Sequence, residues 1–176
     1  MDIPSLIALI SVLLASTGLL VTLFIIDIRH FLLPNIYVFP LGLCGVLFHF
    51  LTDFTLLSPT DMIGGAIVGG GFLYLVRAAG TYYYKQEAMG LGDVKLLISG
   101  GLWLGPSGTL FAIIAGAGAG IIHGILIAAY VSIKNKIPFN IKRLIIPAGP
   151  GFIIGLVLTF WIYNGSYISA WIMGAL

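Results

Sequence analysis

Two carboxylates stand out in this sequence because each lies at the edge of an apolar run. Asp93 belongs to the stretch Glu87–Leu97, which reads EAMGLGDVKLL, and Asp27 ends the first apolar run. Acidic groups beside hydrocarbon are costly and are therefore candidates for function. Two carboxylates within hydrogen-bonding reach share a proton and titrate as a unit. One can then take a proton from water while the other donates one to a carbonyl oxygen, as in aspartic proteases.

The residues around Asp93 suit such chemistry. Gly90 and Gly92 allow a tight turn and let a substrate backbone come close. A carboxylate pair of this kind works without a metal ion or an organic cofactor, so we expect neither. Cys44 is the single cysteine, which excludes an intrachain disulfide and a zinc site built from several cysteines.

The composition indicates that these residues lie in a membrane. Of the 176 residues, 60% are hydrophobic and 8% are charged, and the mean hydropathy is +1.13. A soluble domain is typically under half apolar and about a quarter charged. We therefore expect an all-α polytopic membrane protein surrounded by lipid. The net charge of +2 suggests no nucleic-acid partner.

We expect one integral-membrane domain over residues 1–176 with six transmembrane helices. The N-terminal run has no Lys or Arg ahead of it and is too long for a signal peptide, so we expect it to be retained. Pro34 should end the first helix and Asn35 should cap the second. The expected spans are Ile3–Ile26, Ile36–Leu51, Met62–Ala79, Val94–Leu104, Thr109–Ile133 and Ile145–Tyr163. Arg77 should close the third span, residues 106–108 should form a turn before the fifth, and residues 147–151 should break the sixth near its start. The tail over residues 164–176 would either extend the last span or lie in the interface.

The fourth span and the glycines predict how the helices pack. Val94–Leu104 reaches only about 17 Å as a helix, so Asp93 should lie below the membrane surface on its own side. Gly65 and Gly69 form a small-xxx-small pattern that lets helix backbones approach closely. Three glycines at four-residue spacing in the fifth span predict a second close contact: Gly116, Gly120 and Gly124.

The positive charges predict the topology. All eight Lys and Arg residues fall in or beside the first, third and fifth connections, whereas Asp2, Asp53 and Asp61 lie at the N-terminus or in the second connection. The positive-inside rule then places the odd connections in the cytoplasm and both termini outside. Asp27 and Asp93 would consequently share the cytoplasmic side. The eight residues are Arg29, Arg77, Lys85, Lys95, Lys134, Lys136, Lys142 and Arg143.

The motifs together resemble one family, the prepilin peptidases, or type IV leader peptidases, which are Gly-x-Gly-Asp membrane aspartic proteases. The resemblance runs from Asp27 to about Gly155 and is specific because several motifs occur together at this spacing. They are Asp27-Ile28-Arg29 with Leu33-Pro34-Asn35, then Gly90 to Leu97, Trp103-Leu104-Gly105 and Ile146 to Pro150.

The resemblance implies a function and a substrate. Asp27 and Asp93 would be the catalytic pair of an inner-membrane endopeptidase. It would act on type IV prepilin or pseudopilin precursors, which carry a short basic leader ahead of an apolar helix, and would remove that leader at the cytoplasmic face. Many members also carry paired Cys-x-x-Cys motifs in a methyltransferase domain, which one cysteine cannot supply, so we expect no methyl transfer. Asn35, where many members have aspartate, leaves the subclass open.

Further residues are supporting candidates. Glu87 is a candidate for binding the basic leader, or else a solvated loop charge. Lys95 is either a topology anchor or a group that tunes the aspartates. Gly90, Gly92, Pro34 and Asn35 complete this supporting set.

The alternative hypothesis is a small ion- or proton-coupled transporter or channel subunit that uses Asp27 and Asp93. Broken helices and membrane carboxylates are typical of that class. The sequence shows no inverted repeat, and the aspartates fall toward one face rather than the midplane. A purely structural membrane protein is the third possibility, but it leaves the turn from Gly90 to Lys95 unexplained.

Overall fold

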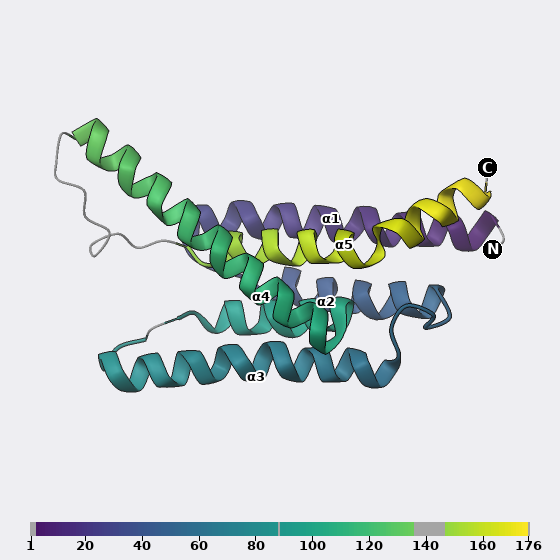
Figure 1. Cartoon of the computed structure of the whole chain (residues 1–176), viewed down its shortest axis with the longest axis horizontal. Coiled ribbons are helices and arrows are strands. Elements are labelled where there is room, and N and C mark those ends of the chain that lie inside the picture. The colour runs from purple at the N-terminus through teal and green to yellow at the C-terminus, as the bar shows by residue number, and fades with distance from the viewer. Residues whose placement is uncertain (1–2, 88, 136–146, 176) are drawn as a thin grey trace.

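The computed structural model describes residues 3–87, 89–135 and 147–175, with helices and no strand in these ranges (Figure 1). Four helices are long and apolar enough to cross a membrane, and the fifth, α2, is a shorter apolar helix of 17 residues. The fold therefore agrees with an all-α polytopic membrane protein. The helices are α1 (Ile3–His30), α2 (Asn35–Leu51), α3 (Pro59–Tyr84), α4 (Leu91–Asn135) and α5 (Gly149–Ala175).

The predicted fourth and fifth spans lie within one element, α4, which is interrupted at a single residue. Gly105 has φ 67° and ψ −177°, and the chain turns back on itself after it (Figure 1). Pro106 disfavours helical backbone at the residue before it, and glycine accepts a positive φ. We had expected a turn over residues 106–108, but proline is tolerated in the first turn of a helix, so helix resumes at once.

The connection between α1 and α2 differs from the prediction in two ways. α1 continues to His30, so Asp27 lies within its last turn rather than after it. Asn35 does not cap α2, because Pro34 occupies the N-cap position and no side chain bonds the first turn. The proline holds the extended backbone that an N-cap needs, and this leaves the Asn35 side chain free for another partner.

The close approach predicted at Gly65 and Gly69 is confirmed, and the helix that meets these glycines is the first half of α4. A Cβ on Gly65 would collide with the carbonyl oxygen of Gly101, and one on Gly69 would lie 2.5 Å from the Leu97 oxygen. Position numbers rise on one helix as they fall on the other, so the two segments are antiparallel. Close backbone approach of this kind increases van der Waals packing, which is one of the forces that associate helices in lipid.

A second glycine contact joins the second half of α4 to α5. A Cβ on Gly116 would lie 2.9 Å from the Phe152 Cα, and one on Gly151 would lie 3.1 Å from the Gly120 Cα. Gly124, the third predicted residue, is buried. The close packing predicted for the fifth span is therefore confirmed at Gly116, whereas a Cβ on Gly120 would meet nothing within 4 Å.

α2 runs parallel to the first half of α4 and is bonded to it by polar side chains. Ser99 Oγ donates to the Val38 oxygen at 2.9 Å, and Trp103 Nε1 donates to the Leu41 oxygen at 2.9 Å. Each bond joins an α4 side chain to a carbonyl of α2, which fixes the register of the two helices. The starts of α2 and α4 consequently lie at the same end of the molecule.

The two ends of the molecule differ in charge. Both termini lie at one end (Figure 1), where Asp53 lies in the α2–α3 connection and Asp61 in the first turn of α3. The opposite end holds the last turn of α1 and the α3–α4 connection, with their basic residues. Three of the eight predicted cytoplasmic charges (Lys136, Lys142 and Arg143), together with Asp2 and the start of the predicted sixth span, lie outside the described residues.

α5 settles one question that the sequence left open. The predicted sixth span stopped at Tyr163, and the tail beyond it was expected either to extend the helix or to lie in the interface. The helix continues without a break to Ala175.

Candidate active site

Asp27 is held by the first residue of α5. Its side chain is 4% exposed, and its Oδ2 accepts a hydrogen bond from the Gly149 backbone N–H at 3.1 Å. The first N–H groups of a helix have no partner within the helix and carry the positive end of its dipole, so they favour a carboxylate. A Cβ on residue 149 would lie 2.5 Å from the Asp27 Oδ2. Glycine is therefore required here for space.

Asp93 lies in the first turn of α4 and is 8% exposed. The turn before it packs on the α1–α2 connection, since a Cβ on Gly92 would lie 2.8 Å from the Leu33 Cβ. At Gly90 a Cβ would lie 3.5 Å from the Asp93 Oδ2, which is an ordinary contact. The two glycines of the motif therefore differ, because only Gly92 is needed for close packing.

The two aspartates interact with each other. Asp93 experiences the charge of Asp27 across the site, and both carboxylates are buried. Like charges that interact in a buried site cannot easily both ionise, so ionisation of one acid opposes ionisation of the other. The structure thus brings together two acids that lie far apart in the chain and belong to different helices.

Lys95 and Asn35 link the two halves of the motif. Lys95 Nζ, one turn into α4, donates to Asn35 Oδ1 at the start of α2 at 3.0 Å. Pro34, directly before Asn35, forms the N-cap of α2. These three supporting candidates tie the α4 turn to the α1–α2 connection, next to the contact of Gly92 with Leu33.

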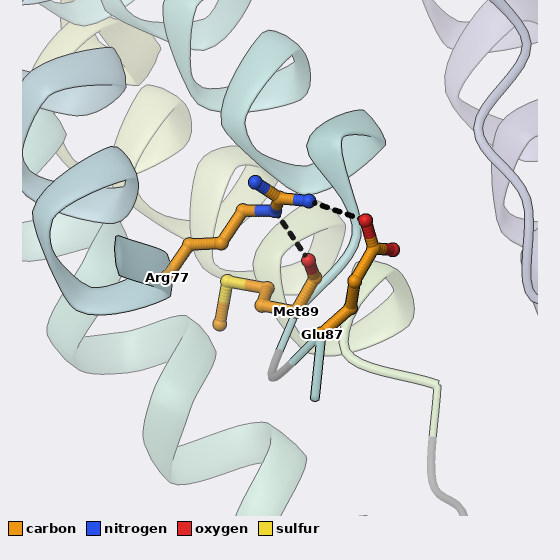
Figure 2. Close-up of polar contacts among 3 residues, drawn as sticks. All are labelled: Arg77, Glu87 and Met89. Atoms are coloured by element: carbon orange, nitrogen blue, oxygen red, sulfur yellow. Dashed lines mark hydrogen bonds and ion pairs between the residues drawn. The ribbon is translucent and has the colours of Figure 1, made fainter. Parts of the chain in front are cut away.

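Glu87, the remaining candidate, is paired with Arg77 of α3 (Figure 2). Arg77 Nη2 lies 3.0 Å from Glu87 Oε1, and Arg77 Nε donates to the Met89 carbonyl at 2.8 Å. The Glu87 side chain is 80% exposed, whereas that of Arg77 is 16% exposed. Arg77 therefore holds the turn that leads to Asp93 from the α3 side.

Two of these residues were not predicted as part of the site. Arg77 was interpreted as the end of a span, although an Arg in the last turns of an apolar helix needs local partners and could have signalled a role. Gly149 was noted only within a stretch that breaks a helix. Its contact with Asp27 joins residues 122 positions apart, and no local pattern encodes that pairing.

His49 is buried in α2. Its Nε2 lies 3.1 Å from the Trp103 oxygen, and its Nδ1 has no hydrogen-bond partner among the described residues. Within those same residues, no group of three or more His, Cys, Asp or Glu side chains is arranged to hold a metal ion.

The sequence pattern of the type IV leader peptidase family matches residues 14–125, a segment that contains both aspartates. The chain belongs to this family. The leader peptidase HopD of Escherichia coli is 32% identical over 139 residues, which cover 77% of this chain and 85% of that protein. The resemblance drawn from the sequence motifs is therefore confirmed.

Other relatives in the type IV leader peptidase family are longer. The prepilin leader peptidase/N-methyltransferase of Escherichia coli K12 is 34% identical over 109 residues, which cover 60% of this chain and 48% of that protein. The Aeromonas salmonicida protein of the same name is 30% identical over 161 residues, 91% of this chain and 51% of its own length. The chain thus spans about half the length of these relatives. No solved structure matches it significantly.

Proposed function

We propose that this chain is an aspartic endopeptidase that removes the short basic leader of type IV prepilin or pseudopilin precursors. The observation that carries the proposal is the burial of Asp27 and Asp93 together, in electrostatic contact, at the charged end of the helices. Membership of the leader peptidase family supports the substrate class. The 176 residues contain one cysteine, so methyl transfer that depends on paired Cys-x-x-Cys motifs is not part of the proposal.

The contacts suggest which aspartate does what. Asp27 accepts a hydrogen bond from the Gly149 N–H, which favours the charged form, so Asp27 is the better candidate for the ionised member of the pair. It would take a proton from water as the hydroxyl attacks the scissile carbonyl carbon, while Asp93 gives its proton to the carbonyl oxygen. The resulting diol collapses as Asp27 passes its proton to the leaving nitrogen, the C–N bond breaks and one diol hydroxyl returns a proton to Asp93. The products are a leader with a new carboxylate and a mature chain with a free amine.

The break in α4 and the position of the basic residues support a protein that crosses the membrane six times and has its active site on the cytoplasmic side. The two halves of α4 on either side of Gly105 would cross separately, with both termini outside. The first half, Leu91–Leu104, reaches about 21 Å as a helix, less than the roughly 30 Å of a bilayer core. Arg29, Arg77 and Lys85 lie at the Asp27 end, as the positive-inside rule requires of a cytoplasmic side.

The test is cleavage of a pilin-like precursor by single variants, followed by gel shift in detergent or lipid. Asp27→Asn and Asp93→Asn each keep nearly the shape of the side chain but cannot hold or release the shared proton. Each should therefore lower the rate of precursor cleavage by about a thousandfold or more. The double variant should be scarcely worse than either single variant, because the two groups act as a unit. Robust cleavage by Asp93→Asn would refute the mechanism.

Matched controls come from the opposite end. Asp53→Asn and Asp61→Asn should cleave at close to the wild-type rate, and protein level is checked for every variant. The same set tests the transporter alternative, in which the aspartates would form an ion or proton site. Wild-type protein that moves protons across vesicles in an Asp93-dependent manner but cleaves no precursor would favour that alternative.

A further inference from the structure

An apolar groove of about 740 Å³ lies between α1 and α5, two helices that run side by side (Figure 1). One wall is the face of α1 from Ile10 to Phe24, and the other is the face of α5 from Ile153 to Ile168. The side chain of Trp103, from α4, also lines it. No residue placed in the active site above lines this groove.

The two walls meet at the proposed active site. Phe24, the last α1 residue in the groove, precedes Asp27 by three positions, or about 4.5 Å along a helix. Ile153, the first α5 residue, follows Gly149 by four positions, or about 6 Å. Asp27 and Gly149 are joined by their hydrogen bond. The groove therefore ends within about one helical turn of the catalytic carboxylate and extends away from it.

The groove has the length and chemistry of a helix-binding site. From Ile10 to Phe24 it follows α1 for about 21 Å. Its two α1 hydroxyls already donate within their own helix, Ser16 to the Val12 oxygen at 2.7 Å and Thr17 to the Leu13 oxygen at 2.8 Å. The lining therefore offers apolar surface and no free hydroxyl donor, which suits one face of an apolar helix and not a polar ligand.

We propose that this groove holds the apolar helix of the precursor. The proposal rests on the proposed function and adds where the substrate lies. A precursor cut just ahead of its apolar helix must bring that helix into the bilayer beside the aspartates. Enzyme and substrate share one membrane, so the helix must lie along a lipid-accessible face that reaches Asp27. The groove provides such a face, because Leu14 and Val21, which line it, are exposed. The seated helix would run antiparallel to α1 from the cut site toward the opposite end.

This arrangement predicts a register. Thr17 lies ten positions before Asp27, or about 15 Å along α1. The precursor residue level with Thr17 is therefore about ten positions after the cut. Gly18, the next residue, is a matched control, because a Cβ there would meet nothing within 4 Å and Gly18 does not line the groove.

Disulfide cross-linking tests the register directly. Thr17→Cys and Gly18→Cys are made in a Cys44→Ala, Asp93→Asn background, in which the substrate binds and is not cut. Each is oxidised with precursors that carry one cysteine at successive positions from 4 to 16 after the cut. Cross-links from Thr17→Cys should peak near position 10, with few from Gly18→Cys. Equal cross-linking by the two variants, or none with either, would overturn the proposal and leave lipid as the occupant.

Kinetics provide a second test in active enzyme. Thr17→Trp fills the groove and should raise KM for the precursor by about tenfold or more with little change in kcat. Gly18→Trp should keep wild-type KM. Cleavage by Thr17→Trp with unchanged KM would show that the groove does not bind the precursor helix, while the proposed peptidase activity would stand. Failure of the wild-type enzyme to cleave any precursor would instead overturn the proposed function.

Discussion

Gly149→Ala is the sharpest test of how Asp27 is held. The added Cβ would lie 2.5 Å from the Asp27 Oδ2 and 2.9 Å from its Cγ, closer than carbon atoms are found in proteins. Gly149 does not have a positive φ, so its backbone accepts alanine without strain. The Asp27 carboxylate must therefore move, and the hydrogen bond from the residue 149 N–H is lost.

The size of the effect follows from that bond. A hydrogen bond to a charged group contributes about 1.5 to 3 kcal/mol. If the bond stabilises the ionised Asp27 that activates water, its loss lowers kcat by about tenfold to about a hundredfold. KM should change little, because Gly149 does not line the proposed groove for the precursor helix.

The assay is steady-state cleavage of a pilin-like precursor by the purified variant, with thermal unfolding measured in the same detergent. Gly118→Ala is the matched control, since a Cβ there would meet nothing within 4 Å. A Gly149→Ala enzyme that unfolds at the wild-type temperature and retains wild-type kcat would refute the role given to this N–H. An equal loss in Gly118→Ala would show that the effect is not specific.

Two further predictions concern the turn that carries Asp93. Gly92→Ala should lower kcat/KM by about tenfold or more, because overpacking against Leu33 shifts the turn, whereas Gly90→Ala, with only an ordinary contact, should cost at most a few-fold. Arg77→Ala should lower kcat by about tenfold or more, because the Met89 carbonyl loses a charged donor. Glu87→Gln should change kcat less than about fivefold, because an exposed ion pair contributes roughly 0–1 kcal/mol.

The comparisons within each pair decide these predictions. Equal kinetics for the Gly92 and Gly90 variants would show that the contact with Leu33 does not position Asp93. A larger loss in Glu87→Gln than in Arg77→Ala would mean that the Glu87 carboxylate acts by itself. If that loss were confined to KM, the carboxylate would be binding the basic leader, and Arg77 would be only its partner.

Most of the helices could be predicted because their signals are local. Apolar runs of sufficient length, with Pro and Gly at their ends, gave α2 and α3 within a few residues of the observed bounds. The predicted break between the fourth and fifth spans was in the right place. Its form was wrong, because a single glycine with positive φ reverses the chain and the proline that follows resumes the helix at once.

The two acids of the candidate site could be identified from the sequence, but the groups that surround them could not. Asp27 and Asp93 were identified from charge in an apolar sequence and from a motif, both of which are visible along the chain. The hydrogen bond that Asp27 accepts comes from α5, and the Arg77 side chain reaches the α3–α4 connection. Such contacts depend on how helices pack. The glycine patterns predicted that certain faces pack closely but not which helix each one meets.

The position of Asp27 is itself an argument for function. A carboxylate in the last turn of a helix faces the negative end of the helix dipole, which disfavours the ionised form. Here the positive end of α5 lies against the same carboxylate and offsets that effect through the Gly149 N–H. Asp93 lies in the first turn of α4, where the dipole favours negative charge, yet burial and the charge of Asp27 oppose it. Each acid is thus subject to opposing influences from its own helix and from its surroundings, which is how two carboxylates in one site come to differ in their ionisation.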